Sequence, residues 1–169
     1  MIEIKNQYLM TEKQYDDLIK YCLQTCDYFM FVTCNYDFLD DYPAKMENFK
    51  NKLKNLFVKE RSNPIWPSTE SLDDRHTYNI CFYKCNTNAF NILKAPGGVF
   101  EWLYPNYPED LSFFRGNECF MYLSAHEKEL WFKNETDEDF AFFKEIGICQ
   151  ENTERLPDYF SETFYEDGL

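Results

Sequence analysis

The chain of 169 residues is 44% hydrophobic and holds 5 glycines and 7 prolines. This composition excludes intrinsic disorder and predicts one folded domain over residues 1–169. The net charge of −13 disfavours direct binding of nucleic acid or of an anionic membrane surface. No stretch approaches the roughly 18 uncharged apolar residues of a membrane helix, and the N-terminus carries acids where an export signal has a basic region, so we expect a cytoplasmic protein.

The first third of the chain predicts a helix, a strand and a second helix. Thr11 suits the N-cap of a helix whose apolar face is Tyr15, Leu18, Ile19, Cys22 and Cys26. Residues 28–34 are β-branched and aromatic, which predicts a buried strand. The second helix is expected to begin at Asp40 or Asp41 and to bury Tyr42, Met46, Phe49, Leu53, Leu56 and Phe57. Residues 45–61 hold six Lys/Arg against two Glu, which is typical of a solvated helix face.

Turn-forming residues separate the predicted elements in the middle of the chain. Residues 62–77 contain two prolines and predict a loop long enough to serve as a flap or a binding loop. Strands are expected over 78–85 and over 99–104. Pro108, followed by two acids, predicts a short helix over 111–114.

The last third predicts a hairpin and a helix. Residues 118–124 and 129–133 read as two strands, with His126 at the turn between them. Thr136 is the expected cap of a helix that Gly147 ends, and the acidic tail is expected to be helical around 158–165. Because strands follow one another with helices at both ends, the sequence predicts an α+β fold, with a mostly antiparallel sheet and helices packed on one side.

The seven cysteines are an odd number and fall within apolar patterns, so we interpret them as buried free thiols. The helical pair Cys22 and Cys26 belongs to an apolar stripe, and the tight-turn CxxC pairs of a zinc site are missing. We therefore expect no metal and no cofactor.

Residues with catalytic chemistry are few. Ser124 or Cys119 with His126 would form a hydrolase pair, but the sequence has no strained GxSxG turn and no HExxH motif. Glu109, Asp110 and Glu127 lie in sequence near aromatic residues, as in a sugar-binding or glycosidase-like cleft, although acids at this place are also typical helix caps. The absence of a recognisable catalytic set favours a protein that is not an enzyme.

The 33 aromatic residues exceed what one core of this size can bury, and residues 101–169 carry 17 acids against five bases. Aromatic side chains surrounded by acidic residues are typical of a surface that binds a basic protein. The candidate binding residues are Trp102, Tyr104, Tyr107, Glu109, Asp110, His126, Glu127 and Trp131.

The segment 102–132, with its PEDLSFF turn and its C-x-x-x-L-x-S-x-H-E hairpin, is followed by FFKEIGI. Together with TEKQYDDLIKYC, this pattern resembles a group of small bacterial proteins, some of which carry the label stage III sporulation protein AH. The resemblance covers about half of the chain and implies a bacterial or phage source, with no particular activity.

Two functions follow from these observations. The favoured one is a non-catalytic protein that binds a basic protein partner, of the immunity protein, antitoxin or inhibitor type. The alternative is a small hydrolase or ligand-binding protein with its site around Trp102–Asp110 and His126–Glu127. A pocket lined by those residues would favour the alternative, and a broad acidic face would favour the first.

Overall fold

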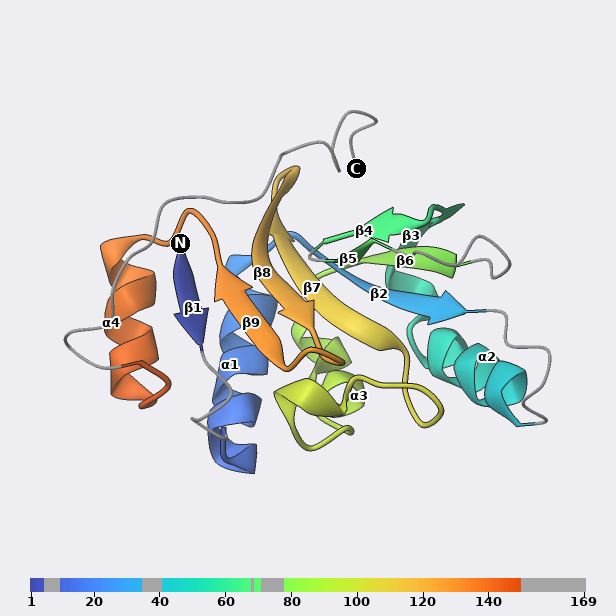
Figure 1. The fold of residues 1–169 in the computed structure, drawn as a ribbon, viewed down its shortest axis with the longest axis horizontal. Helices are drawn as coiled ribbons and strands as arrows, with labels where there is room; N and C mark the ends of the chain where they lie inside the picture. The colour runs from blue at the N-terminus through green and yellow to red at the C-terminus, as the bar shows by residue number, and fades with distance from the viewer. Residues whose placement is uncertain (5–9, 35–40, 68, 71–77, 150–169) are drawn as a thin grey trace.

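The computed structural model describes residues 1–4, 10–34, 41–67, 69–70 and 78–149 (Figure 1). They form a single-domain α+β fold around a sheet of seven strands, as the sequence predicts. In spatial order the strands are β1 (Ile2–Ile4), β9 (Glu129–Phe132), β8 (Glu118–Ser124), β7 (Glu109–Arg115), β2 (Tyr28–Cys34), β6 (Tyr78–Lys84) and β3 (Phe57–Ser62). Each neighbouring pair in this sheet is antiparallel.

Four helices pack against one face of the sheet: α1 (Glu12–Thr25), α2 (Tyr42–Lys52), α3 (Phe90–Leu93) and α4 (Asp137–Glu145). Each contributes to the same core cluster, through Leu18, Phe49, Leu93 and Phe143 respectively. Figure 1 shows α4 beside β1 and α2 toward the other end of the sheet. Three short 3₁₀ turns are also present: η1 (Lys54–Leu56), η2 (Thr87–Ala89) and η3 (Val99–Glu101). None of the helices in the described ranges is long and apolar enough to cross a membrane.

The predicted starts of the first and last helices are confirmed by their capping geometry. The Thr11 hydroxyl accepts a hydrogen bond from Gln14 N, and Thr11 N donates one to Gln14 Oε1; Thr136 and Asp139 form the same reciprocal box at α4. Each box satisfies two backbone donors that the first turn of a helix leaves without partners.

The sheet is buried on both faces at its centre. Phe29 and Phe31 of β2 stack on Tyr83 of β6 at ring distances of 5.3 and 5.0 Å, on the helical side. The alternate residues Met30 and Val32 belong to a second cluster on the opposite face. This two-sided burial explains why the strand reads as a continuous apolar run.

The predicted secondary structure differs from the structure at three places in the middle of the chain. Residues 99–101 form η3 in place of the predicted strand. Residues 109–115 form β7 in place of the predicted helix over 111–114, because this segment pairs with both β2 and β8. The predicted loop contains a small hairpin of β4 (Ile65–Trp66) and β5 (Thr69–Glu70), while residues 71–77 lie outside the described residues.

The second helix is shorter than its apolar stripe predicts. It ends at Lys52, and Leu56 and Phe57 belong to η1 and β3. The basic segment 45–61 is therefore divided between a helix and an edge strand. The predicted helix around 158–165 lies outside the described residues.

Candidate functional site

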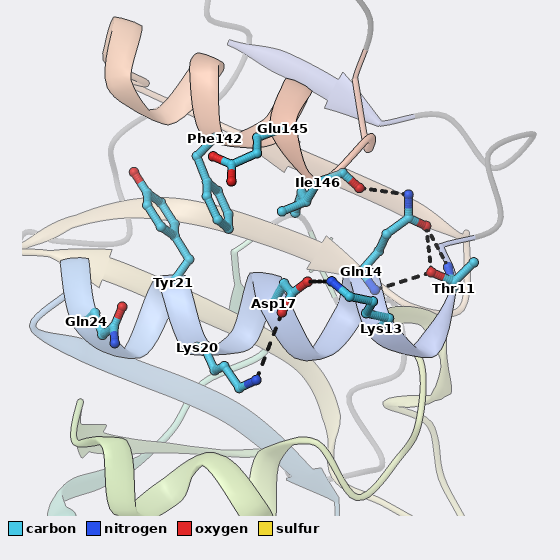
Figure 2. Close-up of a pocket in the computed structure, with 10 residues that line it drawn as sticks. All are labelled: Thr11, Lys13, Gln14, Asp17, Lys20, Tyr21, Gln24, Phe142, Glu145 and Ile146. Carbon is cyan, nitrogen blue, oxygen red and sulfur yellow. Dashed lines mark hydrogen bonds and ion pairs between the residues drawn. The ribbon is translucent and has the colours of Figure 1, made fainter.

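A groove with a volume of about 510 Å³ lies between α1 and α4 (Figure 2). We call it the α1–α4 groove. Its α1 wall includes Lys13, Gln14, Asp17 and Tyr21, and its α4 wall is formed by Phe142, Glu145 and Ile146. Both walls belong to regular helices with well-formed caps, so the groove is held by the fold.

The central feature of the groove is a stacked pair of half-buried rings. Tyr21 and Phe142 lie 3.9 Å apart between ring centroids with an interplanar angle of 10°, and Figure 2 shows them face to face across the two helices. The Tyr21 hydroxyl donates to Asp139 Oδ1 at 2.5 Å. Burial and the Asp139 carboxylate raise the pKa of Tyr21, so this hydroxyl remains a donor at neutral pH. The ring pair is therefore fixed at its polar end.

Asp139 anchors this arrangement through a charge pair. Arg115 donates to both carboxylate oxygens, at 2.6 and 2.8 Å, and its guanidinium lies 3.7 Å from the Phe120 ring centroid. Only 1% of the Asp139 side chain is exposed. A bidentate contact with arginine fixes the position of a buried carboxylate. The Asp139 carboxylate in turn fixes the position of the Tyr21 hydroxyl that donates to it.

The opposite end of the groove is closed by Gln14. Its Nε2 donates to the carbonyls of Ile146 and Gly147 at 2.9 and 3.2 Å, which caps the C-terminal end of α4. Beside it, the Asp17 carboxylate forms ion pairs with two lysines, at 2.5 Å from Lys13 Nζ and at 3.9 Å from Lys20 Nζ. The described residues that line the groove include no histidine, cysteine or serine.

A second polar cluster lies at the start of β7, and it contains two residues that the sequence nominates. Asp110 is 5% exposed with a φ of 53°, and it accepts hydrogen bonds from the Trp66 indole at 2.7 Å and from Ala125 N at 2.8 Å. The neighbouring Glu109 accepts a weak contact from Cys34 Sγ at 3.8 Å. Cys34 Sγ also lies 3.7 Å from the Tyr42 hydroxyl. We call Cys34, Tyr42, Glu109 and Asp110 the Glu109 cluster.

The surroundings of Glu109 raise the pKa of its carboxyl group. Burial and the nearby Asp110 raise the pKa of Glu109 to about 7, although the Cys34 contact and His126 oppose the shift. A carboxyl group that titrates near neutral pH can donate or accept a proton under ordinary conditions. The predicted role of these two acids as helix caps is wrong, since both lie in a strand.

The nominated aromatic residues do not share one surface. Trp102 is fully buried, and its indole donates to the Tyr15 hydroxyl at 2.8 Å. Tyr104 packs on Tyr42 beside the Glu109 cluster, with ring centroids 5.7 Å apart. Tyr107 packs on Phe49, and Trp131 belongs to the cluster on the opposite face of the sheet.

His126 lies in the turn between β8 and β9 and its side chain is 87% exposed, as the hairpin predicts. Its Nδ1 is 3.3 Å from Glu127 Oε1, and Glu127 is also exposed. Ser124 is 5% exposed on β8, and Cys119 Sγ contacts the Met121 carbonyl. The imidazole therefore points into solvent, away from the buried environment that a hydrolase pair needs.

Sequence reasoning did not find Tyr21, Phe142 and Gln14 as candidates. One signal was available, because the FAFF run of α4 places three rings on a helix that can bury only one face against the core. Cys34 and Tyr42 carried no such signal, because their contact with Glu109 depends on the sheet order.

The seven cysteines are free thiols; the prediction of burial is confirmed for six of them, whereas Cys85 is half-buried. Within the described ranges, no group of three or more His, Cys, Asp and Glu side chains is arranged to hold a metal ion. Comparison of the chain with protein-family models, with curated proteins and with solved structures finds no match.

Proposed function

We propose that this protein is a non-catalytic binding protein that recognises a basic segment of another protein through the α1–α4 groove. The observation that carries the proposal is the stacked, half-buried pair of Tyr21 and Phe142 in a groove of about 510 Å³. The expected partner offers one apolar or aromatic side chain to these rings, flanked by Lys or Arg.

Rigid aromatic rings suit this role for an energetic reason. Binding energy concentrates in a few aromatic anchors that exclude water, and a surface that is already ordered loses little side-chain entropy when it binds. Tyr21 is fixed by Asp139, and Phe142 by stacking on Tyr21 and by its edge contact with Phe143 at 6.2 Å.

Charges along α4 support a basic partner. Glu138, Phe142 and Glu145 are spaced at i, i+4 and i+7, so they lie along one face of the helix. Glu138 and Glu145 are exposed, and neither has an ion-pair partner in the described part of the chain. Such acids steer a cationic partner toward the rings and raise its association rate.

The test begins with a pull-down and then measures binding kinetics with the partner so found. Phe142→Ala should speed dissociation and weaken binding by on the order of 2 kcal/mol, because it removes the anchor. Glu138→Lys and Glu145→Lys should slow association and reduce its dependence on salt.

Matched controls use residues outside the groove. Phe57 is a 47% exposed ring on β3, so Phe57→Ala should leave dissociation unchanged. Glu101→Lys gives the same charge reversal on η3 and should leave the association rate nearly unchanged. The proposal fails if Phe57→Ala and Glu101→Lys affect binding as strongly as the substitutions at Phe142, Glu138 and Glu145.

A second candidate function rests on the Glu109 cluster. Glu109 has a pKa raised to about 7 and lies 3.8 Å from a thiol, which would suit a proton-transfer role in a small hydrolase. Screening with ester and glycoside substrates tests it. Activity that rises or falls through about pH 7 and is lost in Glu109→Gln, but kept in Glu127→Gln, would favour this function over binding.

A further inference from the structure

A second groove, of about 410 Å³, lies between α2 and the segment 103–107. Its lining consists of Lys45, Asn48, Phe49, Lys52, Asn106 and Tyr107. We call it the α2 groove. In a chain whose net charge is −13, this lining contains two cationic side chains and no acid. The local charge is therefore opposite to that of the molecule.

The two lysines are available for an external anion. Neither Lys45 nor Lys52 has an ion-pair partner among the described residues, whereas Lys50 of the same helix is paired with Glu60. Lys45 and Lys52 are seven residues apart, which places them on the same face of α2 about 10 Å apart along its axis. Asn48 lies between them, one turn after Lys45, and adds an amide donor and acceptor.

Two rings, Phe49 and Tyr107, form an aromatic wall of the groove. The Tyr107 ring lies 6.3 Å from that of Phe49, at an interplanar angle of 84°. Its hydroxyl donates to the Ala95 carbonyl at 2.9 Å, so the ring is held in position from outside the groove. Phe49 is in turn packed on Trp102 and Phe31 of the core, at 5.8 and 5.5 Å. The wall is therefore ordered before any ligand arrives.

We propose that the α2 groove binds a small organic phosphate that carries a planar ring. Lysine ammonium groups bind phosphate as point charges, the amides of Asn48 and Asn106 supply hydrogen bonds, and the Tyr107 ring offers a stacking surface. The volume of about 410 Å³ falls within the range of small-molecule sites. This site is separate from the α1–α4 groove and does not depend on the function proposed there.

The experiment is a titration of the full chain with adenosine monophosphate at low salt, in which binding is monitored through amide chemical shifts. Saturable shifts are expected at Asn48, Asn106 and Tyr107. Inorganic phosphate and adenosine, titrated separately, should each bind more weakly, because each supplies only half of the recognised chemistry. Lys45→Ala and Lys52→Ala should each weaken binding by about fivefold, and added salt should weaken it further.

Two pairs of variants separate the site from general charge effects. Tyr107→Phe keeps the ring and should retain binding, whereas Tyr107→Leu should reduce it by about tenfold through loss of stacking. Lys84→Ala removes an exposed lysine at the end of β6 and should change nothing. No saturable shift up to about 10 mM ligand, or an equal loss in Lys84→Ala and Lys45→Ala, would overturn the proposal.

Discussion

The Trp66 indole donates a hydrogen bond to Asp110 Oδ2 at 2.7 Å, and this contact joins the β4–β5 hairpin to the start of β7. The other oxygen of Asp110 accepts from Ala125 N at 2.8 Å, at the end of β8. One buried carboxylate thus holds together three segments that are distant in sequence.

The first prediction concerns this contact. Asp110→Ala leaves two buried donors without an acceptor and puts alanine at a φ of 53°, so we expect a loss of about 3–5 kcal/mol in the free energy of unfolding. Trp66→Phe should cost about 1–3 kcal/mol. Urea unfolding of both single variants and the double variant measures their coupling, with Glu101→Ala as an exposed control. Additive effects would show that the contact contributes nothing.

The second prediction concerns pH and Glu109. Its pKa is about 7 in the folded protein against an ordinary value of 4.5, so the folded state binds the proton more tightly. Stability should therefore fall as pH rises from about 4.5 to 7, by at most about 3 kcal/mol, and the loss should be complete above pH 7. Glu109→Gln should match the wild type near pH 4 and exceed its stability at pH 8. The exposed Glu127→Gln should follow the wild-type profile throughout.

The third prediction concerns Asp139 and has the opposite sign. Burial alone would raise the pKa of Asp139, but hydrogen bonds from Arg115, Tyr21 and Thr136 outweigh it and hold the pKa well below the usual 3.8. Its stabilisation is therefore present above about pH 4 and is lost as pH falls through the acid range. Asp139→Asn should lower the free energy of unfolding by about 2–4 kcal/mol at pH 7, since it leaves Arg115 unpaired.

Glu138→Gln is the control for Asp139, because it neutralises an exposed acid in the same first turn of α4. It should change stability at pH 7 by less than about 0.5 kcal/mol. If Asp139→Asn and Glu138→Gln lowered the free energy of unfolding equally, the stabilisation would come from the helix dipole and not from the contact with Arg115.

The fourth prediction concerns the thiols. Burial raises the pKa of Cys22 and of Cys85, while a hydrogen bond from Cys22 lowers that of Cys26. Because these side chains pack in the apolar interior, thermal unfolding should be the same with and without reductant and after treatment with a chelator. Elemental analysis that finds one zinc per chain, or a chelator-induced loss of fold, would contradict this prediction.

Local signals in the sequence predict several elements correctly. Thr11 with Gln14 and Thr136 with Asp139 have the spacing of capping boxes, and the two apolar runs on either side of His126 are separated by a short turn. These features depend on neighbours within a few residues, which a sequence displays directly.

The errors arise where distant pairing overrides local preference. Pro108 and two acids resemble the first turn of a helix, yet Phe114 pairs with Tyr28 across the sheet. The candidate site shows the same limit, because Tyr21 and Asp139 are 118 residues apart in sequence. Periodicity assigns each helix its buried face, but it does not tell which two helices meet.

The sheet order has a consequence for the way this protein forms. β1, at the beginning of the chain, occupies an edge and hydrogen-bonds to β9, whose last residue is Phe132. During synthesis, residues 2–4 therefore have no strand to join until most of the described chain has left the ribosome, whereas β7, β8 and β9 can pair as soon as they emerge. We expect this meander to form early and β1 to dock last, so protection of the Ile2–Ile4 amides should appear late in pulsed hydrogen exchange.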